Sequence, residues 1–399
     1  MATMIGAGIF GTSGAFAHDL GSDTSVLLVW LFSGLLALTG ALSLGELSAM
    51  MPKNGGCYTY NRYLYGNTAG YLSGVLSWLL GFVGATAFIT LLLGVHVTKV
   101  VPGLPPLAPA ITVVLLFTLV HCYGLREGNG VNNFFTVFKV GVILAFIVGG
   151  FLVDAPAAVV TQPATSGLFS AVFASSMLKA GFAYLGWETS TWIAGDISNP
   201  KRNLPRSLII GTILVTVLYL LLNAVFLRAQ SAASMTGEIP DIGLHSAKLL
   251  FSPAASSWFN WMIIVVLLST TSTIIMVGAR ILQSMAANGQ LPSSLGQLSP
   301  THVPKNALLL QAVFTVGFIV AIDQVSRVGA VLDYLILLLT FIMAATVTGV
   351  LVLRRREPDS ERPFRVPLYP FTPLLFLGLS AWMIISTMIN DKKAALASA

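Results

Sequence analysis

The sequence predicts an all-α membrane protein in which two of the membrane helices are interrupted partway across the bilayer. Three observations lead to this fold class. The chain of 399 residues is 55% apolar and only 9% charged, with a mean hydropathy of +0.84, whereas a soluble protein of this length needs far more polar surface. Apolar runs of roughly 20 residues, long enough to cross a hydrocarbon core, recur along the chain. Two of these runs each contain a glycine-rich patch.

The apolar runs predict eleven membrane segments. The first is a short piece at residues 1–17, which has no basic region before it and is therefore not a signal peptide. The other ten are residues 26–51, 69–97, 107–123, 131–153, 169–194, 207–226, 258–286, 307–321, 328–353 and 369–389. Because the connections between the segments are short, residues 1–399 are predicted to form a single transmembrane domain.

The distribution of Lys and Arg predicts the orientation of the chain. If the loop after residue 51 is cytoplasmic, thirteen of these residues fall on the cytoplasmic side and six on the opposite side. This excess follows the positive-inside rule, and the opposite orientation would reverse it. We therefore interpret the net charge of +6 as a sorting signal and expect no nucleic-acid partner. Cys57 and Cys122 fall near the reducing cytoplasmic face, where a disulfide is not expected.

The first glycine-rich patch, residues 5–11, lies near the start of the chain. Its small residues let backbone amides approach a ligand closely. Because a helix resumes after them, its free amides and the positive end of its dipole suit a carboxylate. The alternative interpretation is a small-residue face for helix packing, which is common in membranes. The predicted binding residues of this patch are Ile5, Gly6, Ala7, Gly8 and Ile9.

The second patch, residues 181–188, interrupts the sixth predicted segment. The helix that enters it from outside is expected to end near Gly181, and the carbonyl groups that it leaves without partners suit an ammonium group. Phe182 and Tyr184 would form a pocket wall or a shutter, and core packing is the alternative for both. The predicted binding residues of this patch and of the eighth segment after it are Phe182, Ala183, Tyr184, Gly186 and Ile274.

Together the two patches predict a carrier. Unwound backbone persists in a bilayer only where it lines a cavity or binds a polar ligand, and a pair of interrupted helices indicates the midplane site of a secondary transporter. Amides at one patch and carbonyls at the other would hold the two ends of a zwitterion. Since the first set has five segments, an odd number, the second set enters from the opposite face and forms an inverted repeat. We predict repeats at residues 1–153 and 169–353, with an extra helix at residues 369–389.

Four groups of residues resemble motifs of one transporter superfamily. They are GELSAMMPKNGGCYTY at residues 45–60 with Gly66 and Gly70, GWE at 186–188 with GDISNPKRNLP at 195–205, Arg280 with ANGQLP at 287–292, and LRRREP at 353–358 with RPFRVP at 362–367. They occur in the family's order along nearly the whole chain. The chain therefore resembles an amino acid permease of the amino acid–polyamine–organocation (APC) superfamily, and within it the LAT-like carriers of neutral amino acids.

This resemblance implies a LeuT-like fold of five plus five helices, with interruptions in helices 1 and 6, and amino acid transport by alternating access. It also implies that Gly6, Ala7 and Gly8 bind the substrate carboxylate, and that the carbonyl groups around Phe182 and Ala183 bind its amine. Compared with the family, both ends of the chain look truncated, at the inner half of helix 1 and at helix 12.

Two ionisable residues are candidates for coupling. Lys139 lies about eight residues into the fifth segment, where an ion is costly and usually functional. In relatives of this kind, a lysine here occupies the space of a sodium ion near a hydroxyl of the eighth segment, which would be Thr270. The resemblance thus implies sodium independence, with Lys139 as a strut or a proton-coupling group; the alternative is snorkelling to the cytoplasmic face. Glu188 is the second candidate, so exchanger and proton symporter both stay open.

An enzyme and a channel are the rival function classes. The run at residues 11–14 resembles the glycine-serine-glycine loop of rhomboid intramembrane serine proteases, but such chemistry needs a histidine base beside Ser13. The five histidines fall at segment ends or in loops. A channel would be expected to show a filter or pore repeat, and the sequence contains neither. We therefore expect no enzymatic activity.

The predicted substrate is a neutral amino acid, because Phe182, Tyr184 and Ile274 are apolar or aromatic and Lys139 adds positive charge nearby. The alternative is a cationic amino acid or polyamine antiporter, in which Glu188 would be the acid that binds the cationic side chain. No cofactor or metal is expected. The protein is predicted to be a multi-pass protein of the plasma (inner) membrane, surrounded by lipid, and the sequence leaves a partner subunit open.

Overall fold

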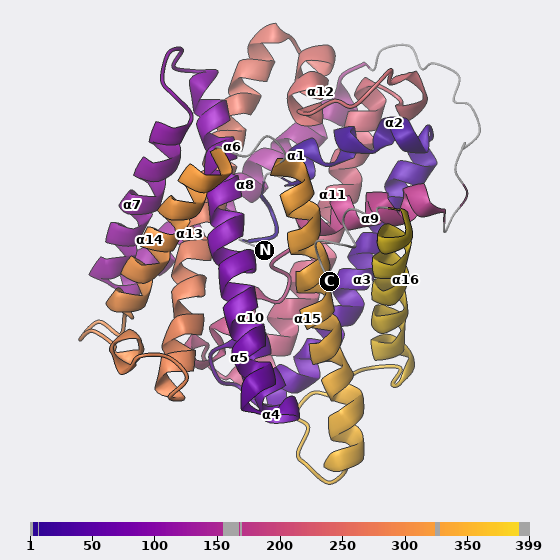
Figure 1. The fold of residues 1–399 in the computed structure, drawn as a ribbon. Helices are drawn as coiled ribbons and strands as arrows, with labels where there is room; N and C mark the ends of the chain where they lie inside the picture. Colours follow the sequence, from indigo (N-terminus) through magenta and orange to yellow (C-terminus); the bar gives the residue numbers. More distant parts are fainter. Residues whose placement is uncertain (1–2, 7, 155–166, 168–169, 324–327, 391–399) are drawn as a thin grey trace.

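A computed structural model gives the fold of the chain and describes residues 3–6, 8–154, 167, 170–323 and 328–390. All of the regular secondary structure in these residues is helical (Figure 1). Eight helical stretches among them are long and apolar enough to cross a membrane, and they coincide with eight of the eleven predicted segments. Leu107–Tyr123 is a shorter apolar helix with the predicted bounds. The all-α membrane class is therefore confirmed.

The remaining two predicted segments, residues 1–17 and 169–194, are each built of short pieces instead of one helix. The pieces of the first are α1 (Gly8–Gly11), η1 (Ser13–Ala15) and α2 (Ala17–Leu20). The pieces of the second are α9 (Ala171–Tyr184), α10 (Thr189–Trp192) and η3 (Ala194–Asp196).

Long helices surround these two segments. Before the second segment the chain forms α3 (Asp23–Met50), α4 (Gly56–Tyr65), α5 (Asn67–Leu76), η2 (Ser77–Gly84), α6 (Ala85–Thr98), α7 (Leu107–Tyr123) and α8 (Leu125–Leu152). After it come α11 (Pro200–Ala229), η4 (Ala232–Ser234), α12 (Ile242–Leu250), α13 (Pro253–Ala287), η5 (Ser293–Gly296), α14 (Lys305–Asp323), α15 (Val328–Arg356) and α16 (Phe371–Asn390).

The helix starts follow ordinary capping rules. The side chain of Ser170 accepts a hydrogen bond from the amide of Phe173 at the start of α9, at 3.2 Å. Proline occupies the first turn of α11 and of α13, where its missing amide proton costs nothing. Gly66, with φ of +94°, separates α4 from α5 in a conformation that favours glycine.

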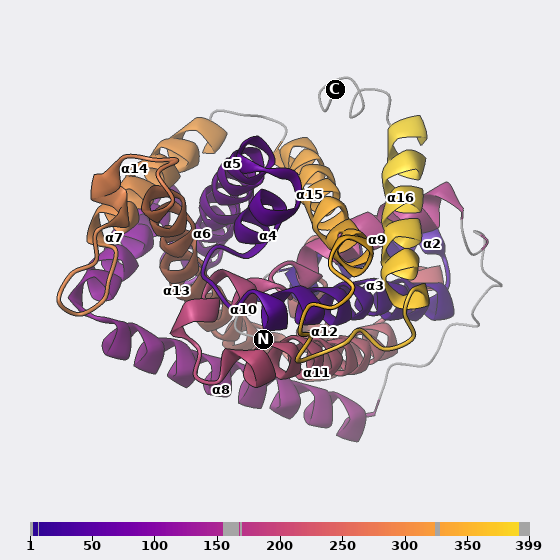
Figure 2. The same ribbon diagram turned by 90° about the horizontal axis from the view of Figure 1, so that it is seen from below.

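The helices pack into a bundle with α13 and α3 near its centre. α13 contacts α6, α7, α8 and α14, and α3 packs along α11, α9, α15 and α16. Figure 2 shows α8 and α11 side by side along one edge of the bundle. The 18-residue apolar window of α13 is the most buried of the candidate spans, at 83%. The helix contacts both interrupted segments, through the bond from Thr270 to the carbonyl of Ile5 and through its packing against α10.

One helix contains a wide turn. α5, η2 and α6 run as one stretch from Asn67 to Thr98, and the part from Ser77 to Gly84 is π-helical. Such turns insert an extra residue into an α-helix and are frequent at functional sites.

The buried carboxylate of Glu46 joins the ends of α3 and α15 on the predicted cytoplasmic side to the loop that leads into α16. It accepts hydrogen bonds from Arg354 Nε and Nη2, at 3.0 and 2.7 Å, and from the Val366 amide at 2.7 Å. Arg362 Nε lies 3.3 Å away as a second cationic partner. Because a buried carboxylate needs such partners, this cluster fixes α15 and α16 against α3 and holds three helices around the interior.

Candidate functional site

The first interrupted segment is held by side chains from two distant helices. Residues 3–6 are turns, and α1 starts at Gly8. The carbonyl oxygen of Ile5 accepts hydrogen bonds from Lys139 Nζ on α8, at 2.9 Å, and from Thr270 Oγ1 on α13, at 3.0 Å. Lys139 is fully buried and therefore does not reach toward the cytoplasmic face.

The amides of this segment are available to a ligand. Neither Gly6 nor Gly8 donates its amide to another described residue. Ala7, which the sequence places between them, lies outside the described residues. Ile5 and Ile9 are buried in the apolar core and face away from the cavity described below.

The second interruption lies later in the chain than the sequence suggests. α9 continues through Gly181 to Tyr184, so the expectation that the helix ends near Gly181 is wrong by about one turn. The unwound part is Leu185–Glu188, and Gly186 has φ of +96°, which favours glycine. Gly181 carries no constraint of this kind, because an apolar helix tolerates an isolated glycine.

The two interruptions contact each other directly. A Cβ atom added to Gly8 would lie 2.7 Å from the Ala183 Cα, so only glycine permits this approach. Thr3 Oγ1 donates to the carbonyl of Gly186 at 3.0 Å and lies 2.9 Å from Thr189 Oγ1. The backbones of two segments about 180 residues apart are therefore in contact.

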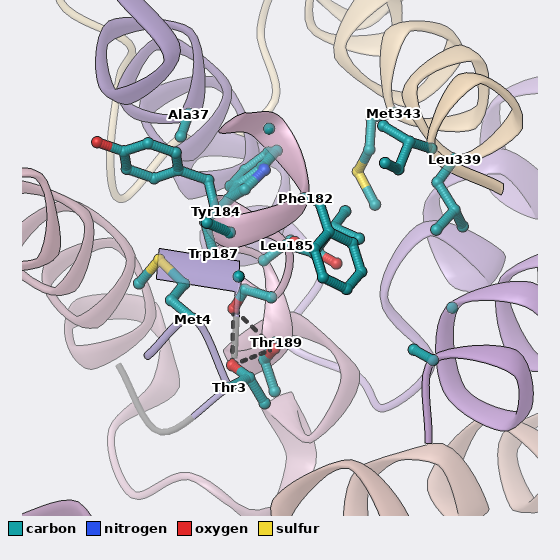
Figure 3. A pocket seen from close by; sticks show the side chains of 18 of the residues that line it. Thr3, Met4, Ala37, Phe182, Tyr184, Leu185, Trp187, Thr189, Leu339 and Met343 are labelled. Carbon is teal, nitrogen blue, oxygen red and sulfur yellow. Dashed lines mark hydrogen bonds between the residues drawn. The ribbon is translucent and has the colours of Figure 1, made fainter. Parts of the chain in front are cut away.

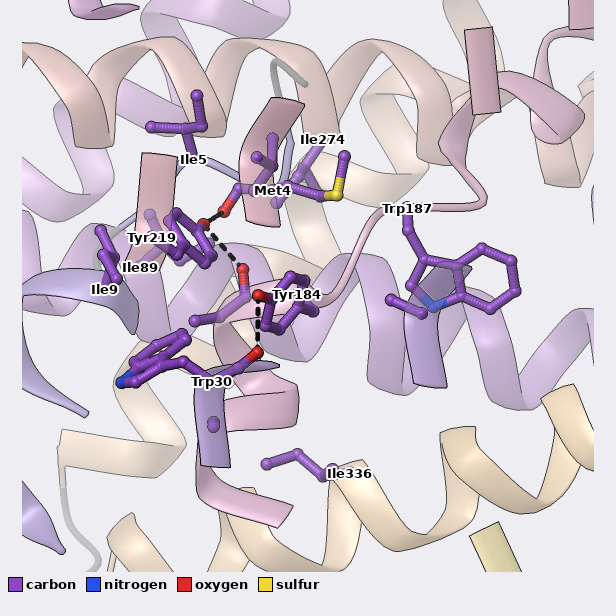
Figure 4. Packing of buried hydrophobic residues seen from close by; sticks show 14 of the residues in the cluster. Met4, Ile5, Ile9, Trp30, Ile89, Tyr184, Trp187, Tyr219, Ile274 and Ile336 are labelled. Carbon is purple, nitrogen blue, oxygen red and sulfur yellow. Dashed lines mark hydrogen bonds between the residues drawn. The ribbon is translucent and has the colours of Figure 1, made fainter. Parts of the chain in front are cut away.

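Tyr219 connects both interruptions to α11. Its hydroxyl lies 2.6 Å from the carbonyl of Met4 and 2.9 Å from that of Ala183 (Figure 4). The rings of Trp30, Tyr184 and Tyr219 pack against one another, with centroids 5.1 to 5.9 Å apart. The sequence analysis missed Tyr219; the available signal was a hydroxyl in the middle of an apolar span, since a buried tyrosine usually has a hydrogen-bond partner.

A cavity of about 120 Å³ lies beside the contact between the two segments (Figure 3). The predicted residues that line it are Gly6, Gly8, Phe182, Ala183, Tyr184, Gly186, Glu188, Thr270 and Ile274. Ile5, Ile9 and Lys139 do not line it. The fold therefore brings most of the predicted site residues to one cavity and leaves Lys139 behind the first interruption.

The other walls of the cavity come from helices that the sequence analysis did not assign to the site. The π-helical turn contributes Ser77, Gly81 and Phe82, and α15 and α16 contribute residues such as Met343 and Phe376. Apolar side chains in continuous helices give no local sign that they face a ligand, so sequence reasoning could not single them out.

Glu188 stands at the cavity wall with part of its carboxylate unsatisfied. Its Oε2 atom is buried and has no hydrogen-bond partner among the described residues. A buried polar atom without a partner is costly. This atom is therefore a candidate to receive a donor from a ligand.

The chemistry of a serine protease is not assembled at Ser13. Its hydroxyl accepts a hydrogen bond from Trp30 Nε1, at 2.9 Å, and donates to Asn223 Oδ1. Neither partner is a base of the kind that activates a serine nucleophile.

Comparison with known proteins agrees with this geometry. Residues 1–396 match the family model described as amino acid permease. The serine/threonine exchanger SteT of Bacillus subtilis is 27% identical over 400 residues, covering 98% of this chain and 89% of that protein. The mouse large neutral amino acids transporter small subunit 2 is 28% identical over 412 residues, covering 97% and 74%. The mouse b(0,+)-type amino acid transporter 1 is 27% identical, covering 98% and 80%.

The family match spans nearly the whole chain and includes both interrupted segments. Members of this family are membrane transporters, so the protease interpretation is excluded together with any other enzymatic one. Amino acids are the class of substrate that the family implies. The chain is thus a membrane protein of the amino acid permease family, within the APC superfamily of transporters.

Proposed function

We propose that this permease carries neutral amino acids by alternating access, as an exchanger or a proton symporter that does not require sodium. The observation that carries the proposal is the direct contact between two interrupted segments beside one cavity. Two of the relatives are a serine/threonine exchanger and a large neutral amino acids transporter small subunit, which supports the proposal.

The proposed architecture is the LeuT-like inverted repeat. Residues 1–153 form the first repeat, residues 169–353 the second, and residues 369–389 the extra helix. Support comes from the two interruptions, each of which occurs in the first segment of its proposed repeat. Repeats of this kind place the binding site at their interface near the bilayer midplane.

In the proposed binding mode, the two interruptions hold the two ends of an amino acid. The amides of Gly6 and Gly8, which have no partner among the described residues, donate to the carboxylate, together with that of Ala7 between them. The carbonyls of Phe182 and Ala183, in the last turn of α9, receive the ammonium group. Each of these carbonyls already accepts one hydrogen bond, that of Phe182 from the Leu185 amide at 3.2 Å and that of Ala183 from Tyr219 at 2.9 Å. A carbonyl oxygen has a second lone pair, which leaves room for a donor from the substrate.

The side chain of the substrate would face an apolar wall. The cavity is lined by hydrophobic residues that include Leu36, Ala37, Ile89, Ile274, Leu339 and Met343. An anionic side chain would lose its hydration against these residues, and a cationic one would need the carboxylate of Glu188 as its partner, whereas a neutral side chain needs neither. The wall therefore favours a neutral amino acid.

Lys139 provides the reason to propose sodium independence. Its ammonium group bonds to the carbonyl of Ile5, an oxygen of the kind that would otherwise coordinate a cation. Thr270 bonds to the same carbonyl. The fixed positive charge of Lys139 would take the place of a bound sodium ion. As a proton-coupling group, Lys139 would also make transport depend on pH.

A cationic amino acid or polyamine remains the second candidate, because of the unsatisfied Oε2 atom of Glu188 at the cavity wall. A cationic substrate would donate to this atom. Replacement of Glu188 by Gln distinguishes the two: transport of a neutral amino acid should persist, whereas transport of arginine or a polyamine should be lost.

The test of the proposed function is uptake by purified protein in proteoliposomes. Labelled serine, leucine and arginine are offered with unlabelled amino acid inside, and sodium is replaced by choline in a parallel sample. We expect saturable counterflow of neutral amino acids that is the same in both samples. Linear, unsaturable flux, a strict need for sodium, or counterflow of arginine alone would contradict the proposal.

The role of Lys139 is tested by Lys139→Ala, with Lys179→Ala as a matched control. Both lysines lie in membrane helices and donate to a backbone carbonyl, Lys179 to Ala15 at 3.3 Å. We expect Lys139→Ala to lose uptake or its pH dependence, measured between pH 5 and 8, and Lys179→Ala to retain both. Normal pH-dependent uptake by Lys139→Ala would remove it from the coupling mechanism.

A further inference from the structure

A basic groove lies at the cytoplasmic end of α11, away from the substrate cavity. It is lined by Pro52, at the end of α3, and by residues 199–203 and Arg206, at the start of α11. α11 packs along α3 in this part of the bundle, as Figure 2 shows from the predicted cytoplasmic side. The groove contributes nothing to the binding mode proposed above, so its charge needs a separate explanation.

Two guanidinium groups in this groove have no partner within the described part of the protein. Arg202 and Arg206 are exposed and form no side-chain hydrogen bond or ion pair with any described residue. Lys201 has one contact, at 3.4 Å, with the exposed carboxylate of Glu361. Each guanidinium presents a planar set of donors that matches a phosphate group.

Apart from Glu361, which contacts Lys201, two further acidic residues on the adjoining elements are bound elsewhere. Asp196, in the turn before α11, pairs with Arg280 at 3.0 Å. Glu46, near the end of α3, is fully engaged by Arg354 and by the Val366 amide. The groove therefore keeps an excess of positive charge.

An apolar surface follows these charged residues along α11. Residues at helical spacing after Arg202 and Arg206 lie on the same face of α11. They are exposed and apolar: Ile210, Ile213, Leu214, Val217 and Leu221. A ligand that used both surfaces would need an anionic head and a hydrocarbon tail.

The depth of the groove fits such a ligand. The apolar part of α11 starts after Ser207, so Arg206 marks the end of the hydrocarbon region on the predicted cytoplasmic side. Basic pockets between membrane helices on that side bind anionic lipid head groups. The positive-inside rule accounts for basic residues in this loop, but it does not require that two unpaired arginines share one groove.

We propose that this groove binds the phosphate of an anionic glycerophospholipid, whose acyl chains lie along the exposed face of α11. Arg202 and Arg206 hold the phosphate, and Lys201 contributes charge. The occupant is a lipid of the cytoplasmic leaflet rather than a soluble phosphate, because the apolar face continues from the groove into the membrane.

The experiment compares an R202Q/R206Q variant with an R355Q/R365Q control. Arg355 and Arg365 are also exposed on the cytoplasmic side and form no side-chain contact with described residues, so both variants lose the same inside charge. Purified protein in neutral detergent is titrated with phosphatidylglycerol, phosphatidylcholine or inorganic phosphate. Bound lipid is counted by native mass spectrometry, and the thermal unfolding midpoint is recorded.

We expect phosphatidylglycerol to bind the parent protein and the control variant equally and to raise their unfolding midpoints. R202Q/R206Q should bind it roughly 30-fold more weakly, or about fivefold for each arginine, which corresponds to about 1 kcal/mol per basic residue. An equal loss in the control would overturn the proposal in favour of diffuse charge. An equal effect of phosphatidylcholine or of inorganic phosphate would overturn it as well.

If R202Q/R206Q fails to insert, the single variant R206Q keeps more of the inside charge and provides the measurement. It should bind phosphatidylglycerol about fivefold more weakly than the matched R365Q variant. Equal binding by R206Q and R365Q would overturn the proposal. None of these outcomes depends on which amino acid the protein transports.

Discussion

The two interrupted segments are held in place differently. In the first, the carbonyls of Met4 and Ile5 accept hydrogen bonds from Tyr219, Lys139 and Thr270, which lie on three separate helices. In the second, the carbonyl of Gly186 accepts from Thr189 of its own segment and from Thr3 of the first. The unwound carbonyls of the first interruption are thus bound by the surrounding bundle, whereas, among the described residues, that of Gly186 is bound only by the two interrupted segments. On either side of Gly186, the second segment is joined to the bundle by Tyr184, which donates to the carbonyl of Trp30, and by Asp196, which pairs with Arg280.

This difference indicates where motion is least costly. Displacing the first segment breaks contacts to α8, α11 and α13 together. Displacing the whole second segment breaks the packing of α9 on α3 and α16 and the pair between Asp196 and Arg280. A shift confined to residues 185–188 breaks mainly the bonds that Gly186 makes within the two interrupted segments, so the least costly motion is a local one at this unwound part.

The largest expected effect comes from Gly8→Ala, which separates the two segments. The new methyl group would meet the backbone of Ala183 at 2.7 Å, and backbone atoms cannot rotate away. Overpacking of this kind costs about 1–3 kcal/mol. We expect a lower unfolding midpoint in detergent and at least about tenfold less uptake, the change that 1.4 kcal/mol produces.

Gly6→Ala is the control for that change. Its methyl group would lie 3.5 Å from the nearest atoms of Thr270, an ordinary contact distance. The unfolding midpoint should therefore stay close to that of the parent protein. If both variants unfold at the same lower temperature, the loss of stability in Gly8→Ala does not come from its contact with Ala183, and the prediction is wrong.

Tyr219→Phe should have the next largest effect. It leaves the carbonyls of Met4 and Ala183 without this donor, at a cost of about 1–3 kcal/mol for buried groups. Tyr184→Phe, which removes a single bond to the carbonyl of Trp30, is the control. We expect chemical unfolding of Tyr219→Phe at clearly lower denaturant concentration than the control, and equal midpoints would count against a bridging role.

Thr3→Val should have the smallest effect, about 1 kcal/mol, because Thr189 still donates to Gly186 at 2.7 Å. The informative measurement is a double-mutant cycle with Thr189→Val. If the second segment is held through both hydroxyls, the double variant loses more stability than the two single variants added together. Strict additivity would mean that the two threonines act independently.

Much of the fold could be predicted because membrane helices leave a strong signal in composition. The bounds of Leu107–Tyr123 agree with the apolar run itself. The end of α9 was predicted less well, since Gly181 looked like a helix terminator but lies within the helix. The end of α9 is followed by Gly186, whose φ angle favours glycine and which lies against Thr3 of the other interrupted segment. A contact across about 180 residues cannot be read from local sequence.

The same limit applies to the site. Gly8 and Ala183 stood out because their glycine-rich neighbourhoods are unusual in a membrane span. Met343 and Phe376 line the same cavity but look like any other lipid-compatible residue in a long helix. Their role follows from the position of α15 and α16, which the buried Glu46 cluster fixes at the far cytoplasmic end.

Tyr219 has one hydroxyl hydrogen and two acceptors within reach. At any moment it donates this hydrogen to the carbonyl oxygen of either Met4 or Ala183, and the other oxygen receives none from Tyr219. In the proposed binding mode, the ammonium group of the substrate would donate to the carbonyl oxygen of Ala183 while Tyr219 donates to that of Met4. Rotation of the Tyr219 hydroxyl about its C–O bond then moves the hydrogen bond from the carbonyl of one interrupted segment to the carbonyl of the other.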